Sequence, residues 1–277
     1  MTISGGYLGY ADISGSKVRT NSFDIDPAQE PSFYDHSIGL RDNIPTSLFG
    51  AKGDTGYTGK EQKYLYRPSV VGYTGSISFP LQEGVASVLF DQAKTGDSFY
   101  INYSYDCETS RRIDGCRVNS YTLAATSGGV IEVNANIMAT SANEGVALSS
   151  YSFPTKLVTW DKFAFSGHGI TNSLINSFNL SINNNCKYVY TAGTNVANSL
   201  NPHALRVGTQ AVNGTISFYT KGVDIDYLTT TSVKTLNISC DGLNFSLKCV
   251  FSPVKRSGVS GPIVSTLVFN GVGSYFS

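Results

Sequence analysis

The stretch VGYTGSISFPL, at residues 71–81, has a near copy further along the chain, AVNGTISFYTK at residues 211–221. Both copies alternate polar and apolar residues, which is the pattern of a β-strand with one buried face. The matched residues of this repeated phrase are Gly75, Ile77, Ser78 and Phe79 in the first copy and Gly214, Ile216, Ser217 and Phe218 in the second. The repetition predicts that equivalent strands serve two related parts of the molecule.

Alternating runs of the same kind extend over most of the chain. They are rich in β-branched and aromatic residues, and clusters of Gly and Asn separate them. The other predicted strands fall at residues 98–105, 130–138, 175–182, 234–239, 243–251 and 263–269. Many short strands with turn residues between them predict an all-β fold, either a sandwich or a barrel.

The surroundings of the repeated phrase are also repeated. NSFDI at residues 21–25 and NSFNL at residues 176–180 each precede one copy. The shared order predicts two tandem, related β-sandwich or barrel domains at residues 1–148 and 149–277.

Two segments stand outside the simple repeat. The stretch at residues 138–156 is small and polar and contains a proline, so it is the predicted linker between the halves. A further phrase, NSYTL at residues 119–123, has no place in a two-copy scheme.

One segment has helical periodicity. EGVASVLFDQAKTG, at residues 83–96, spaces its apolar residues as a helix does, and Gly96 can end that helix. The prediction is a short helix over residues 84–94 that flanks the first domain. A matching helix is expected after the second copy, although β-branched residues there make it weaker.

The first half carries a long glycine-rich loop near residues 46–66, with GAKGDTGYTGKE at its centre. The glycines recur every third residue, but four triplets without proline are too short for a collagen helix. Long loops in compact domains are usually functional. We therefore expect an arm that reaches a neighbouring subunit, through Gly50, Lys52, Gly53, Asp54, Gly56, Tyr57, Gly59 and Lys60.

Charge and composition restrict the function. Charged residues make up 14% of the chain, against about 25% in ordinary soluble domains. Twenty basic residues balance twenty acidic ones, which argues against stable nucleic-acid binding because such binding needs a basic footprint. Sparse charge suits a subunit that copies of itself cover. The sequence shows neither an apolar stretch of about 18 residues nor a signal peptide, so no membrane contact and a cytoplasmic site of assembly are expected.

The five cysteines, Cys107, Cys116, Cys186, Cys240 and Cys249, are odd in number and form no C-x-x-C element. We expect free thiols rather than disulfides or a zinc site. Two pairs share a spacing of nine residues, which is consistent with duplication.

Residues for catalysis are sparse. His36, His168 and His203 stand in no metal-ligand or nucleophile motif, and His168 between glycines is typical of a turn. The carboxylate pairs Asp24–Asp26 and Asp224–Asp226 fit strand ends or helix starts better than catalysis. The sequence predicts no enzyme, no cofactor and no metal.

The order INSFNLSINNN, a loop, and then VNGTISFY resembles the major tail tube proteins of long-tailed (siphovirus-type) bacteriophages. The first half repeats this order as TNSFDIDPAQEPSFY followed by GYTGSISFPL. The resemblance implies a β-sandwich flanked by a helix, whose inner strands join those of neighbours into a barrel around a lumen. It implies a structural virion protein of the phage tail that stacks in rings, contacts the tape measure and other tail proteins, and lets double-stranded DNA pass into the host. With two domains per subunit, a trimer with pseudo-sixfold symmetry is implied, and a hexamer is the alternative.

Two other functions remain open from the sequence. A two-domain β-sandwich could bind a receptor or carbohydrate, as an adhesin or tail-tip component, and the 17 tyrosines suit recognition. Such a protein would expose an aromatic cluster on loops at one end. A β-sandwich glycosidase would need two carboxyl groups about 5–9.5 Å apart in a cleft.

Overall fold

The structure is a computed structural model, and it confirms the all-β fold: every strand pairing that it contains is antiparallel. It describes residues 9–28, 32–35, 64–67, 72–104, 110–144, 156–167, 170–171, 175–189, 202–219, 232–252, 255–257 and 264–276.

The predicted strands are all present, together with several shorter ones. Those of the first half are β1 (Tyr10–Ile13), β2 (Ser16–Arg19), β3 (Ser22–Ala28), β4 (Ser32–Asp35), β5 (Tyr64–Arg67), β6 (Gly72–Pro80), β7 (Phe99–Ser104), β8 (Ser110–Thr126), β9 (Glu132–Ala139) and β10 (Ser141–Glu144). Those of the second half are β11 (Phe163–Gly167), β12 (Ile170–Thr171), β13 (Ile175–Asn183), β14 (Lys187–Val189), β15 (Ala204–Arg206), β16 (Ala211–Tyr219), β17 (Lys234–Cys240), β18 (Leu243–Phe251), β19 (Lys255–Ser257) and β20 (Val264–Phe276). A short 3-10 helix, η2 (Trp160–Lys162), precedes β11.

The strands of each half pair in the same order along the chain. In the first half the pairs are β1·β2, β1·β7, β3·β6, β4·β5, β6·β9, β7·β8, β8·β10 and β8·β9. In the second half they are β11·β12, β11·β17, β13·β16, β14·β15, β16·β20, β17·β18, β18·β20 and β19·β20. The two lists correspond pair by pair.

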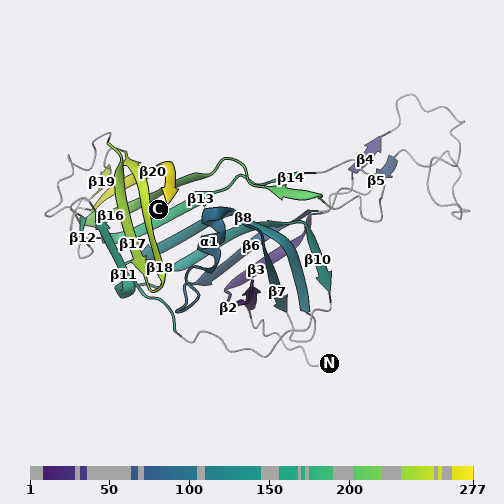
Figure 1. Cartoon of the computed structure of the whole chain (residues 1–277), viewed down its shortest axis with the longest axis horizontal. Coiled ribbons are helices and arrows are strands. Elements are labelled where there is room, and N and C mark those ends of the chain that lie inside the picture. Colours follow the sequence, from purple (N-terminus) through teal and green to yellow (C-terminus); the bar gives the residue numbers. More distant parts are fainter. Residues whose placement is uncertain are drawn as a thin grey trace, which may run out of the picture.

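One sheet runs through both halves in the order β3, β6, β9, β8, β13, β16, β20, β19, and we call it the main sheet. In Figure 1 its long strands β6, β8, β13 and β16 run side by side across the body, and β17 and β18 cross in front of them. Strand β8 belongs to two layers, because its first part, as far as Cys116, pairs with β7, and its second part pairs with β9 from Arg117 and with β13 from Ser120.

The core lies between the main sheet and the outer strands. Phe23 of β3 packs on Tyr103 of β7, with ring centroids 4.4 Å apart, and Phe163 of β11 packs on Phe178 of β13 at 5.3 Å. The buried apolar residues of both halves form one continuous cluster. Burial of this alternating apolar face drives the sandwich together.

Helix α1 (Val88–Thr95) covers the place where β8 meets β13 (Figure 1). It begins four residues later than the predicted start at residue 84 and ends at Gly96, as predicted, with φ at 72° and the Gly96 N–H donating to the Gln92 carbonyl. Phe90 packs on Tyr121 from the first half and on Phe245 from the second, at 5.8 and 4.6 Å. The helix therefore contacts both halves.

The first part of the predicted linker is not a linker, because residues 138–144 complete β9 and form β10, which pairs with β8. The unplaced phrase NSYTL at residues 119–123 lies in β8, beside NSFNL of β13. Residues 46–63 of the predicted glycine-rich loop and the segment expected to hold the second helix, at residues 220–231, lie outside the described residues, whereas residues 64–66 of that loop belong to strand β5.

Candidate assembly surfaces

The main sheet has one polar face. Residues opposite one another across neighbouring strands share a face, so the pairings trace this surface from β3 to β20. Its uncharged polar members include Ser22, Thr74, Ser76, Ser78, Asn134, Asn136, Ser120, Thr122, Asn179, Ser181, Asn213, Thr215, Ser217 and Thr266, and a few members, such as Ala124 and Val268, are apolar. Its charged members are few: the carboxylates Asp24, Asp26 and Glu132 and the basic residues Arg117 and Lys255. This surface is thus mainly hydroxyl and amide.

Hydrogen bonds link side chains across this polar face. Ser22 and Ser78 hydroxyls lie 2.6 Å apart, and those of Ser217 and Thr266 lie 2.9 Å apart. The Asn136 amide donates to the Ser120 hydroxyl at 2.8 Å. Such bonds satisfy polar groups within the sheet.

Strands β8 and β13 join the two halves within the main sheet. Their pairing is unbroken from Thr126 opposite Ser177 to Ser120 opposite Asn183. On the core face, Leu123 lies opposite Leu180, and both are fully buried. We call this pairing the internal junction.

A buried asparagine fixes helix α1 over the internal junction. Asn184 is fully buried, and its amide nitrogen donates to the carbonyls of Ala93 in the helix and Val118 in β8, each at 2.9 Å. Its own carbonyl accepts from the Gln210 side chain at 2.8 Å. Both the nitrogen and the oxygen of the Asn184 amide are therefore hydrogen-bonded, and these bonds hold helix α1 to strand β8.

The repeated phrase occupies corresponding places in the two halves. Its first-copy residues lie in β6, where Ile77 and Phe79 are buried, and its second-copy residues lie in β16, where Ile216 and Phe218 are buried. Both strands belong to the main sheet, but β9, β8 and β13 separate them, so the two copies do not touch as a pair.

The repeated phrase requires glycine at its first position for the same steric reason in both copies. A Cβ added at Gly75 would collide with the backbone of Asp24 in β3, and one at Gly214 would collide with the Asn179 carbonyl in β13 and the Phe269 ring. Only glycine lets the neighbouring strand come this close.

The main sheet ends in two strands that have one partner each in the described part of the chain. Strand β3 pairs with β6, and β19 pairs with β20. An open edge presents unpaired backbone N–H and C=O groups and is a template for another strand. The sequence does not predict β19, because three residues are too few to show alternation. It does not predict the internal junction either, although the phrase NSYTL lies in the part of β8 that forms it.

Four of the five cysteines are described, and they confirm the prediction of free thiols. Cys116, Cys186, Cys240 and Cys249 are all buried. Burial raises the pKa of the Cys240 and Cys249 thiols to about 12 and also raises the pKa of Cys116 and Cys186. Thiols that stay protonated and buried are inert. Cys107 lies outside the described residues.

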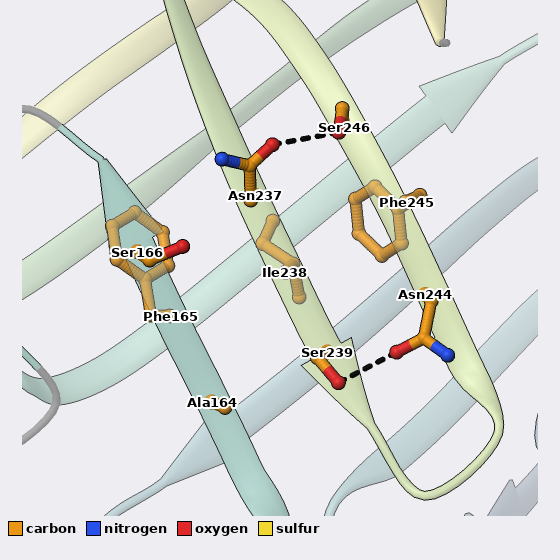
Figure 2. Close-up of a pocket in the computed structure, with 9 residues that line it drawn as sticks. All are labelled: Ala164, Phe165, Ser166, Asn237, Ile238, Ser239, Asn244, Phe245 and Ser246. Carbon is orange, nitrogen blue, oxygen red and sulfur yellow. Dashed lines mark hydrogen bonds between the residues drawn. The ribbon is translucent and has the colours of Figure 1, made fainter.

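The outer face of the second half carries a hollow of about 540 Å³ between β11, β17 and β18. Figure 2 shows its polar side chains bonded to one another, Ser246 to Asn237 and Ser239 to Asn244, each at 2.6 Å. Its aromatic rings, Phe165 and Phe245, are buried, and no carboxylate lines it. The hollow favours neither the carbohydrate-binding nor the glycosidase alternative.

Among the described residues, no group of three or more His, Cys, Asp or Glu is arranged to hold a metal ion. None of the helices described has the length and apolar character needed to cross a membrane.

A family model described as phage tail tube protein matches residues 67–271 of the chain. No curated protein matches it. The matched range includes both copies of the repeated phrase, helix α1 and the internal junction.

Proposed function

Because the chain belongs to the phage tail tube protein family, we propose that its copies assemble into stacked rings that form the tube of a long-tailed phage and conduct DNA into the host. The observation that carries this proposal is the main sheet, which has one polar face and, in the described part of the chain, a strand with a single partner at each end. Two different open edges can pair with each other in neighbouring copies, and such head-to-tail pairing closes a ring.

We propose further that the chain holds two related domains, at residues 1–148 and 149–277, so that three copies supply six nearly equal positions in each ring. The strand pairs of the two halves, which correspond one by one, support this division. So do Cys116 and Cys249, which occupy the corresponding strands β8 and β18. A hexameric ring is the alternative that a count of copies would reveal.

The polar face of the main sheet is the proposed lining of the lumen. DNA must slide through a tail tube without being held, and lysine or arginine contacts to phosphates would hold it. The serine, threonine and asparagine side chains of this face leave it sparsely charged, with Asp24, Asp26 and Glu132 against Arg117 and Lys255 among the charged residues that the strand pairings place on it. The tape measure and other tail proteins are the remaining proposed partners, and the tail of the virion is the proposed location.

Negative-stain electron microscopy of the purified chain tests the proposal. We expect hollow rings or tubes of uniform diameter, formed either spontaneously or when the tail-tip complex of the phage is added. Monomers that remain dispersed at high concentration, even with the tail-tip complex present, would contradict it.

A further inference from the structure

We infer that the β3 edge of one copy pairs with the β19 edge of the next, antiparallel and in the register that the internal junction uses. The inference rests on the proposed function, because it concerns how the rings close. The pairing of β8 with β13 is the model for this contact. We infer that the pairing that joins the two halves within a chain also joins one chain to the next.

The repeated phrase shows which residues of β3 and β13 correspond. Its second residue is Ser76 in β6 and Thr215 in β16. Ser76 lies opposite Asp24 of β3, and Thr215 lies opposite Asn179 of β13. Asp24 therefore holds the place in β3 that Asn179 holds in β13.

The same phrase shows which residues of β19 and β8 correspond. The fourth residue of the phrase is Ser78 in β6 and Ser217 in β16. In the first half, Ser78 lies opposite Asn134 of β9, which in turn lies opposite Thr122 of β8. In the second half, Ser217 lies opposite Thr266 of β20, which in turn lies opposite Lys255 of β19. Lys255 therefore holds the place in β19 that Thr122 holds in β8, and the short strand β19 corresponds to the part of β8 that forms the internal junction.

The internal junction then supplies the register. Within the chain, Thr122 lies opposite Ser181 and Ala124 lies opposite Asn179. Transferred to two copies, these pairs become Lys255 opposite Asp26 and Ser257 opposite Asp24.

Charge supports this register. The internal junction has uncharged residues at these places, whereas the two open edges carry opposite formal charges, Asp24 and Asp26 on β3 and Lys255 on β19. Opposite charges across an antiparallel pair stabilise it, and like charges destabilise it. Two β3 edges would bring aspartates together, so the charges favour β3 against β19 and the single head-to-tail direction that a closed ring needs.

Disulfide trapping tests the register. Residues opposite each other in antiparallel strands have Cβ atoms close enough for a disulfide. In the Asp24→Cys/Ser257→Cys chain, we expect mild oxidation of assembled rings to give covalent dimers and closed trimers on a non-reducing gel. The control Asp24→Cys/Arg256→Cys shifts one cysteine by one residue and thus to the other face, so its yield should be at least about tenfold lower. The wild-type chain reports any background from native thiols.

The outcomes separate this inference from the proposed function. Rings that form but give no excess of cross-links in the first variant overturn the β3–β19 register and leave the tube proposal standing. A chain that forms no rings at all overturns both. Cross-links between copies in the first variant alone support both.

Charge reversal gives a second readout. Lys255→Glu should raise the protein concentration needed for ring formation by about tenfold, and the double variant Asp26→Lys/Lys255→Glu should restore it. Lys248→Glu, an exposed position on β18, is the matched control and should leave assembly unchanged. Failure of the double variant to restore assembly, measured by sedimentation velocity, would overturn the proposed charge pair.

Discussion

Gly75 and Gly214 show how a single residue type can be required twice for one reason. In both places the backbone of a neighbouring strand occupies the space that a Cβ would need. The sequence marked these glycines through the repeated phrase, but periodicity alone could not say why they were glycines. The reason is that β3 lies very close to Gly75 and β13 lies very close to Gly214.

Alanine substitution at either glycine is expected to lower the free energy of unfolding by about 2–3 kcal/mol, because the strands must separate to admit the methyl group. Urea unfolding of Gly75→Ala and Gly214→Ala measures this. Ser76→Ala, at the adjacent position on the polar face, is the control and should change stability by less than about 0.5 kcal/mol. Equal effects at positions 75 and 76 would contradict the packing argument.

The buried thiols predict a pH dependence. Their pKa values in the folded chain lie above the ordinary value of 9.0, so the unfolded chain loses these protons first as the pH rises. Each such thiol should lower the free energy of unfolding by up to about 1.4 kcal/mol per pH unit between about pH 9 and 12. Below pH 9 this contribution to stability is fully present.

Urea unfolding at pH 8 and pH 10.5 measures that slope, and Cys249→Ala should make it shallower. Peptide mapping after iodoacetamide treatment at pH 8 should show Cys116, Cys186, Cys240 and Cys249 unmodified in the folded chain and modified in urea. Rapid labelling of these four in the folded chain would show that they are not buried.

At the scale of elements, the sequence predicted strands well and connections less well. Each predicted run became a strand because alternation reports a half-buried face directly. Strand β10 lies in the segment predicted to be a linker, because its residues are mostly small and polar, and its pairing with β8 is a tertiary contact that no local pattern contains. The two edge strands of the main sheet could not be predicted from the sequence either, because a strand is an edge only by virtue of which other strands pair with it.

Asn184 tests the internal junction at this scale. Asn184→Ala removes the donor that the carbonyls of Ala93 and Val118 share and the acceptor that Gln210 uses, although Gln210 still donates to Ala93. We therefore expect a loss of about 1–3 kcal/mol in the free energy of unfolding. Asn213→Ala, exposed on the polar face, should cost less than about 0.5 kcal/mol. Hydrogen exchange should also quicken in α1 and β8 of the first variant. Similar stability of both variants would mean that Asn184 does not hold the helix.

At the scale of the whole molecule, the main sheet runs through both halves, and its described part has a polar face and an edge strand at each end. The internal junction already shows how one half receives the next within the chain. The same contact, repeated between chains, extends the sheet without leaving an unpaired edge. In the proposed tube, low charge on the polar face would let DNA pass, and opposite charges at the edges would set the direction of assembly.

The central claim is that each chain supplies two equivalent positions of a ring, and cryo-electron microscopy of the assembled tube tests it most directly. The expected map has three chains in each ring, with a continuous sheet around the lumen in which β3 of one chain lies beside β19 of the next. A ring of six chains, or one whose main sheets do not meet at these edges, would contradict it.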